Sequence, residues 1–181
     1  MWCLYLLEGK TVNLRVVEKE DLSLLVGWFN DLEFTGRHNP LDAQQSRAEI
    51  EKKYDNLSSE DKWFFIEKKN GGKVGFIGTH VYGGMLEIGY ALMPAERGHG
   101  YCIEAVKIMV DYLFMSKNIV RIQAATNVEN KASQKVLEKA GFQREGMERK
   151  GLFAWGNWVD LYIYSVLREE WKQPRILTRS P

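Results

Sequence analysis

The sequence contains little cysteine and almost no net charge. Cys3 and Cys102 are the only cysteines among 181 residues, which argues against a disulfide-linked scaffold and for a reducing, cytoplasmic location. Lys and Arg total 25 against 24 for Asp and Glu, so the formal net charge is only +1. Because there is no overall basic excess, nucleic acid and anionic membranes are not expected as partners.

The chain also lacks features that would divide it or place it in a membrane. It has no internal repeat, low-complexity tract or linker, so residues 1–181 are predicted to form a single domain. The apolar segment 1–7 is too short to span a bilayer and has no basic leader or small-residue cleavage site. We interpret it as a packing or dimerising arm, which would make a homodimer possible, with an unstructured end as the alternative. The tail from Trp171, including 172–181, is expected to be solvated.

The stretch from Glu87 to Met115 carries the most informative local pattern. Apolar residues alternate from 87 to 92, which predicts a strand that ends before Pro94. Between 103 and 114 apolar residues recur at spacings of three and four, the pattern of a helix with one buried stripe. The glycine-rich turn between them, 97–102, is a candidate phosphate site. Glycine lets the backbone approach a ligand, and the first turn of a helix has unpaired N–H groups and a partial positive charge.

Two other motifs are excluded for this turn. The GxxxxGK[ST] spacing of a P-loop is absent, and the GxGxxG dinucleotide fingerprint is incomplete. An ordinary loop is the remaining alternative.

The rest of the chain alternates between strand and helix patterns. Strands are predicted at 10–17, 62–68, 73–82, 87–92, 120–126, 142–150 and 159–167, helices at 21–31, 42–56, 101–115 and 131–139, and a loop at 32–40. The Asn-Gly and Gly-Gly junctions at 70–72 and 83–84 predict an antiparallel meander of three strands. The strand at 120–126 follows a helix and should therefore run parallel to its predecessor. Gly141 is expected to end the last helix.

Several short motifs occur along the chain at positions that match the predicted order of strands and helices. They are Leu7-Glu8-Gly9, Trp28-Phe29-Asn30-Asp31, Glu87-Ile88-Gly89-Tyr90, the turn 97–102, Asn130-Lys131-Ala132-Ser133, Glu138-Lys139-Ala140-Gly141-Phe142 and Gly156-Asn157-Trp158-Val159-Asp160. Together they resemble the GNAT acyl-CoA-dependent N-acetyltransferases, and within them the subfamily named for the ribosomal-protein alanine acetyltransferases RimJ and RimL. The turn departs from the R-x-x-G-x-G/A pattern of that family at Cys102, where a slightly crowded loop is expected.

The resemblance implies a fold class and a donor. The fold is a mixed α/β (α+β) domain with a central, mostly antiparallel seven-stranded sheet flanked by four helices. The donor is acetyl-CoA, bound as a co-substrate with no metal. The implied cofactor-binding residues are Tyr90, Ala91, Leu92, Arg97, Gly98, His99, Gly100, Tyr101, Cys102, Asn130 and Ser133.

Each part of this set has its own implied role. The amides of residues 99–102 would hold the pyrophosphate, and Arg97 would favour the phosphates electrostatically. The backbone of residues 90–92 would pair with the pantetheine arm, and Asn130 would hydrogen-bond that arm from the other side. Asn130 could instead cap its helix, and both roles can hold together. Ser133 could be a plain residue of the helix surface.

Transfer of an acetyl group to an amine needs a proton acceptor, because an alkylamine with a pKa near ~10.4 is almost entirely protonated at neutral pH. Glu87 is the predicted general base because it lies on the strand that would carry the thioester arm. The alternatives are Asp31, Glu33, His38 and Asp160. A backbone N–H near Leu92 would hold the developing oxyanion.

Ser133 is predicted to assist the departing thiolate. Some polyamine acetyltransferases of similar sequence use a tyrosine four residues before the Gly-Phe pair, and here that residue is Leu137, which cannot donate a proton. Cys102 offers a competing covalent route, since a helix N-terminus lowers a thiol pKa. Its place in the phosphate loop favours direct attack in a ternary complex instead. His80 and His99 show no metal-ligand spacing with each other or with cysteine.

The leading hypothesis is an N-acetyltransferase that acts on a protein N-terminal amine. One alternative is an enzyme for a small amine, such as a polyamine, an amino acid or an antibiotic. The other is an acyl-CoA-binding sensor without turnover. Acceptor specificity is expected to lie in the loop 32–40, the second helix and the turn 153–158, where no motif is recognisable.

Overall fold

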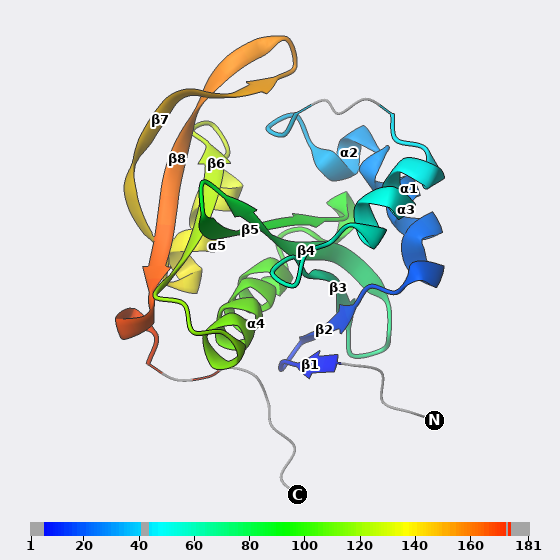
Figure 1. Ribbon diagram of the computed structural model, residues 1–181, viewed down its shortest axis with the longest axis horizontal. Coiled ribbons are helices and arrows are strands. Elements are labelled where there is room, and N and C mark those ends of the chain that lie inside the picture. The colour runs from blue at the N-terminus through cyan, green and yellow to red at the C-terminus, as the bar shows by residue number, and fades with distance from the viewer. Residues whose placement is uncertain (1–5, 41–43, 173, 175–181) are drawn as a thin grey trace, which may run out of the picture.

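The computed structural model describes residues 6–40, 44–172 and 174. Within these residues, eight strands form one sheet in the order β1-β2-β3-β4-β5-β6-β8-β7 (Figure 1). The strands are β1 (Leu6–Glu8), β2 (Val12–Val16), β3 (Trp63–Lys68), β4 (Lys73–Tyr82), β5 (Met85–Leu92), β6 (Arg121–Asn127), β7 (Gln143–Ala154) and β8 (Asn157–Leu167). All neighbours pair antiparallel except β5 and β6, which are parallel.

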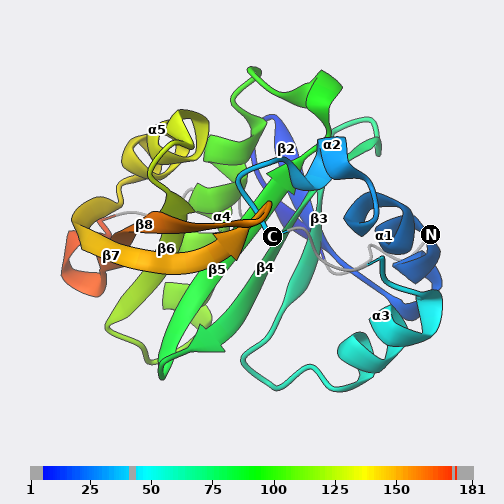
Figure 2. The same ribbon diagram turned by 90° about the horizontal axis from the view of Figure 1, so that it is seen from above.

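The described part of the chain has five α-helices, which lie on the two faces of this sheet (Figure 2). They are α1 (Leu22–Phe29), α2 (Leu32–Thr35), α3 (Arg47–Asp55), α4 (Tyr101–Ser116) and α5 (Lys131–Ala140), and short 3₁₀ turns occur at Lys19–Asp21, Pro94–Glu96 and Arg168–Glu170. In the part of the chain that the structure describes, no helix has the length and apolarity of a membrane span.

Side chains of the central strands point alternately to the two faces of the sheet, and this divides the core into two clusters. On β3, Phe64 and Ile66 belong to a cluster packed against α4, while Phe65 belongs to a second cluster with α1 and α3. Successive side chains of a strand point to opposite faces, so a strand buried on both faces shows a continuous apolar run. The central strands are therefore held rigidly between two layers of helices.

The parallel pair β5 and β6 is short. Its single registered pair in the described residues is Glu87 with Gln123, although β5 continues to Leu92 and β6 to Asn127. Beyond Glu87, the edge of β5 that faces β6 thus has no ladder partner in this part of the sheet. Backbone groups at such an edge can pair with an extended ligand.

The structure confirms the predicted fold class and the parallel direction of the strand after the long helix. The predicted counts of seven strands and four helices are wrong by one each. The eighth strand is β1, which uses the end of the predicted N-terminal arm to pair with β2. The first five residues of that arm lie outside the described residues. The fifth helix is α2, which forms within the predicted loop because the Asp31 side chain caps it.

Two features also differ from the prediction, namely the start of α3 and the environment of Trp171. α3 begins at Arg47, because Ser46 and Glu49 form a capping box there; residues 44–46 are not helical, and 41–43 lie outside the described residues. Trp171 is not solvated, since its Nε1 donates to Asp111 Oδ1 at 2.7 Å and its ring packs against Phe114. Gly141 ends α5 with φ +103°, as expected.

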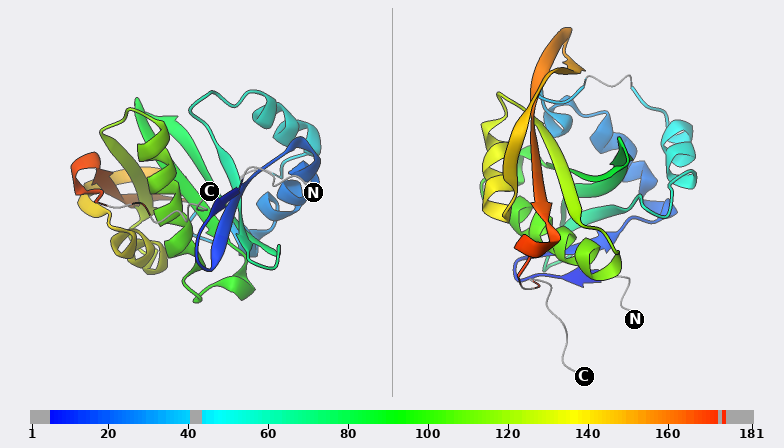
Figure 3. Two further views of the ribbon diagram at one scale, coloured as in Figure 1. Left: turned by 90° about the horizontal axis from the view of Figure 1, so that it is seen from below. Right: turned by 60° about the vertical axis from the view of Figure 1, so that its left-hand side comes forward.

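The hairpin β7–β8 is longer than predicted and rises above the rest of the sheet (Figure 3). Its two-residue turn uses Trp155 and Gly156, both with positive φ. Phe153 and Trp158 form an exposed ring pair beside the turn, with centroids 5.6 Å apart. At the base of the hairpin, Tyr164 and Val166 are buried in the core, and Ala154 is buried next to the turn.

Candidate active site

The glycine-rich turn between β5 and α4 has the geometry of an anion site. Gly98 and Gly100 have φ of +85° and +82°, a region that glycine adopts readily. Gly100 is the N-cap of α4 and provides no side-chain cap, so the amides of the first turn point out of the helix without an intrahelical partner. A Cβ on either glycine would meet no described heavy atom within 4 Å. The turn is therefore uncrowded at both glycines, and its free amides could hold a phosphate group.

Arg97 connects this turn to α2. Its Nε donates to the Leu92 carbonyl at 3.2 Å, and its Nη2 donates to the Glu33 carbonyl at 2.7 Å. The guanidinium thus ties the end of β5 to the helix on the neighbouring face. The predicted electrostatic role of Arg97 toward phosphates stays a prediction.

Cys102 points away from the turn and into the core. Its side chain is 7% exposed, and burial raises the pKa of its thiol to about 12. The thiol is therefore protonated at neutral pH and is a poor nucleophile, in contrast to a thiol activated by a helix N-terminus. The covalent route considered from the sequence has no support in this geometry.

The N-terminus of α5 contacts β5 through two hydroxyl groups. Asn130 caps the helix, because its Oδ1 accepts a hydrogen bond from the Ser133 amide at 3.1 Å. The Ser133 Oγ lies 2.9 Å from the Tyr90 Oη. Burial raises the pKa of Tyr90 well above its usual range, so its hydroxyl stays a neutral donor. Ser133 and Tyr90 thus form one hydrogen-bonded pair beside the unpaired edge of β5.

Glu87 lies at the centre of a second polar group. Its Oε2 accepts from Gln123 Nε2 at 3.1 Å, and its Oε1 lies 3.4 Å from His80 Nε2. The Glu87 side chain is 13% exposed and the His80 side chain 52% exposed. The hydrogen bond to Glu87 raises the pKa of His80 above its ordinary value. The carboxylate is therefore held between β4 and β6, and the imidazole is the more exposed partner.

The sequence analysis missed His80 as a partner of Glu87. The signal was present in the hairpin, because a turn at Gly83-Gly84 pairs Tyr82 with Met85 and so places His80 opposite Glu87. Counting the register across that turn would have found the pair.

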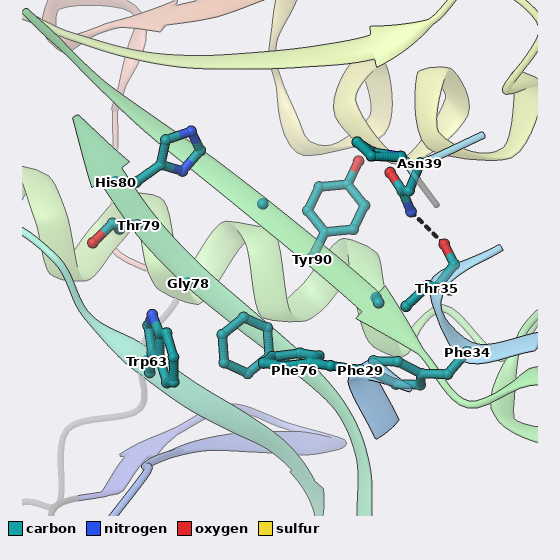
Figure 4. Close-up of a pocket in the computed structure, with 13 residues that line it drawn as sticks. Phe29, Phe34, Thr35, Asn39, Trp63, Phe76, Gly78, Thr79, His80 and Tyr90 are labelled. Carbon is teal, nitrogen blue, oxygen red and sulfur yellow. Dashed lines mark hydrogen bonds between the residues drawn. The ribbon is translucent and has the colours of Figure 1, made fainter. Parts of the chain in front are cut away.

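A pocket of about 300 Å³ lies between α1, α2 and strands β3 to β5 (Figure 4). Its lining residues are Phe29, Phe34, Thr35, Asn39, Pro40, Trp63, Phe76, Gly78, Thr79, His80, Gly89, Tyr90 and Ala91. His80 lies at one end, and the pocket reaches the segment of β5 beside the unpaired edge. Phe34 to Pro40 come from the segment where acceptor specificity was expected.

None of the five predicted bases lines this pocket directly. Asp31 Oδ1 accepts from the Glu33 amide at 2.9 Å as the cap of α2, and Asp160 Oδ1 accepts from the Lys150 amide at 2.8 Å in the β7–β8 hairpin. Glu33 is exposed, and His38 is also outside the lining set. Of the five predicted bases, the geometry connects Glu87 to the pocket, through His80. Over residues 6–40, 44–172 and 174, no group of three or more His, Cys, Asp or Glu could hold a metal ion.

Comparison with protein families gives a match over most of the chain. A family model described as an acetyltransferase (GNAT) domain matches residues 11–143. The N-acetyltransferase p20 of Bacillus licheniformis, itself uncharacterised, is 35% identical over 169 residues, which cover 88% of this chain and 94% of p20. A match of this extent establishes the family.

Two solved structures share the fold at low identity. RimL, a ribosomal L7/L12 alpha-N-protein acetyltransferase in complex with CoA, has a TM-score of 0.78 at 19% identity, covering 90% of this chain and 97% of RimL. The spermidine N-acetyltransferase of Vibrio cholerae, in complex with CoA and spermine, has a TM-score of 0.76 at 20% identity, covering 88% and 97%. The chain therefore belongs to the GNAT family of acetyltransferases, as an acyl-CoA-dependent N-acetyltransferase similar to the RimJ and RimL enzymes.

Proposed function

We propose that the protein moves the acetyl group of acetyl-CoA to a protein N-terminal amine by direct attack in a ternary complex. The observation that carries this proposal is the meeting of two sites on β5. The unpaired edge and the glycine-rich turn after it suit the donor, and the pocket reaches the same strand at Gly89, Tyr90 and Ala91. Donor and acceptor can therefore approach each other without a covalent enzyme intermediate.

The donor site is proposed to use mainly backbone groups. The amides of residues 99–102 bind the pyrophosphate, the backbone of residues 90–92 pairs with the pantetheine arm, and Asn130 contributes a hydrogen bond. Acetyl-CoA, when bound, supplies the acetyl group as a reactive thioester. A backbone N–H near Leu92 donates to the acetyl oxygen as negative charge develops on it.

Proton transfer from the amine is proposed to involve Glu87 through His80. With Nε2 directed at Glu87, the neutral imidazole keeps Nδ1 as the nitrogen that accepts a proton. Glu87 stabilises the imidazolium that results. The role matches the usual requirement for a base whose pKa lies near the working pH.

Ser133 is proposed to donate the proton that the leaving thiolate takes up. The nitrogen–carbon bond forms as the carbon–sulfur bond breaks, and the sulfur needs one proton to leave as a thiol. Tyr90, hydrogen-bonded to Ser133, can replace that proton. The position of the Ser133–Tyr90 pair beside β5 supports this assignment. Leu137, the other position considered for an acid, has no proton to donate.

A small amine is the second candidate acceptor. The V. cholerae enzyme of the same fold is a spermidine acetyltransferase, which supports small amines as an alternative class of acceptor. A sensor that binds acyl-CoA without turnover is the third candidate. A cytoplasmic location and a homodimer remain predictions from the sequence.

Thiol release from acetyl-CoA tests these candidates directly. Purified protein is supplied in parallel with N-terminal peptides, polyamines and free amino acids, and CoA binding is measured in the same preparation. Release with peptides and not with the other amines is the expected result. Release only with polyamines or amino acids would overturn the peptide assignment, and CoA binding without release would favour the sensor.

A further inference from the structure

We infer that the acceptor amine carries a large apolar group, and that this group fills the pocket above Gly89. The inference rests on the proposed function, and it names the chemical class of the acceptor. It commits to a peptide N-terminus whose first side chain is aromatic or branched aliphatic. A free aromatic amine presents the same chemistry and is separated from the peptide by the experiment.

A cluster of aromatic rings forms one part of the pocket wall. Phe29 packs edge-to-face on Phe76 at 5.2 Å and on Trp63 at 6.2 Å, and Trp63 packs on Phe76 at 5.7 Å between centroids. Phe34 adds one further ring. Rings that contact one another in this way keep their positions, so the wall is a preformed apolar surface.

The polar content of the lining does not suit a polyamine. Of the described residues that line the pocket, none is acidic, and the polar ones are Thr35, Asn39, Thr79 and His80. A polyamine carries a second ammonium group that must keep a partner when it leaves water. A single amine directed at His80, with an apolar group among the rings, leaves no such charge unpaired.

Two glycines on neighbouring strands make the floor of the pocket. Gly78 on β4 is registered with Gly89 on β5, so neither strand sends a side chain into this space. At Gly78 a Cβ would meet Phe76 Cζ at 3.0 Å and the Lys62 carbonyl oxygen at 3.1 Å. At Gly89 a Cβ would meet no heavy atom of the described chain within 4 Å. Gly89 is therefore the position where the depth of the pocket is set.

The backbone at Gly89 accepts other residues. Its φ is not in the left-handed region, and β-branched residues are favoured in strands. Gly89→Val should consequently fold while it shortens the pocket. Gly146 on β7 is the matched control, since it is also a strand glycine outside the left-handed region with no described neighbour within 4 Å of an added Cβ.

The experiment compares three proteins on one acceptor panel. Wild type, Gly89→Val and Gly146→Val are assayed with peptides that begin with Phe, Leu or Ala and are otherwise identical, with phenethylamine and with spermidine. In wild type, kcat/KM for the Phe and Leu peptides should exceed that for the Ala peptide at least tenfold, the scale expected from burial of a large apolar side chain. In Gly89→Val this advantage should fall at least tenfold, because kcat/KM for the Phe and Leu peptides falls much more than kcat/KM for the Ala peptide, while CoA affinity changes less than threefold. Gly146→Val should match wild type.

Several results would overturn the inference. These are equal or better use of the Ala peptide or of spermidine by wild type, and an equal loss for all acceptors in Gly89→Val. If only phenethylamine is acetylated, the assignment of a peptide acceptor is wrong, whereas the assignment of an apolar group to the pocket holds. If no amine is acetylated, the proposed function fails. Calorimetric binding of the Phe and Ala peptides to the CoA-loaded protein then decides the inference separately, and equal or absent binding would refute it.

Discussion

The glycine-rich turn makes a quantitative prediction for Gly100→Ala. Gly100 has φ +82°, and an L-residue held in this region costs about 1–2 kcal/mol. An added Cβ would clash with no described atom, so the cost comes from the backbone alone. The free energy of unfolding should therefore fall by about 1 kcal/mol if the turn keeps its shape, because alanine also lowers the entropy of the unfolded chain.

The effect on CoA binding should be larger than the effect on stability. If the backbone relaxes away from the left-handed region, at least one amide of the first turn of α4 no longer points at the pyrophosphate. A hydrogen bond to a charged group contributes about 1.5–3 kcal/mol, which corresponds to a roughly 10- to 100-fold weaker Kd for CoA. Isothermal titration calorimetry measures this Kd, and urea denaturation measures the stability.

Gly84→Ala is the matched control for this prediction. Gly84 lies in the turn between β4 and β5, has φ +78°, and likewise has no described neighbour within 4 Å of an added Cβ. It should lose a similar free energy of unfolding and keep the wild-type Kd for CoA. Equal CoA affinities in wild type and Gly100→Ala would refute the assignment of the turn as the pyrophosphate site.

Two further predictions concern catalysis and folding. Glu87→Gln should lower kcat and leave CoA affinity unchanged. Glu87 raises the pKa of His80, and the neutral imidazole is the form that accepts the proton. Without the Glu87 carboxylate, the acid limb of the plot of kcat/KM against pH should therefore move to lower pH. A limb that stays at the wild-type pH would exclude this pair as the titrating group. Gly9→Ala should lower the free energy of unfolding in urea by about 1–3 kcal/mol, because its Cβ would lie 2.6 Å from the backbone carbonyl oxygen of Val12 and 2.5 Å from Ile108 Cδ1. Unchanged stability would refute this clash.

Features set by local sequence were predictable. The glycine turn before α4 and the stop at Gly141 depend on residues close in the chain, whose backbone preferences act without help from the rest of the fold. The boundary of α3 was missed because the Ser46 and Glu49 capping box decides it, and the polar pattern before Ser46 looks equally helical. The strand β1 was missed because three residues carry too little periodicity.

Features set by tertiary contacts were not predictable in the same way. Phe29, Trp63 and Phe76 lie far apart in the chain and each looks like an ordinary core residue, so the pocket exists only once α1 packs on β3 and β4. The partner of Glu87 was obtainable from hairpin register, whereas Gln123 reaches Glu87 only through the parallel pairing of β5 and β6. The donor side was therefore accessible from motifs, and the acceptor side required the packed sheet.

Arg97 links the end of β5 to the helix beside the pocket. One guanidinium contacts the Leu92 carbonyl at the end of the donor strand and the Glu33 carbonyl in α2, next to the pocket wall at Phe34. Any movement of this cation toward a bound phosphate would loosen α2, and any ordering of α2 by an acceptor would hold the cation back. Such linkage acts equally in both directions, so each bound substrate would lower the affinity for the other by the same factor.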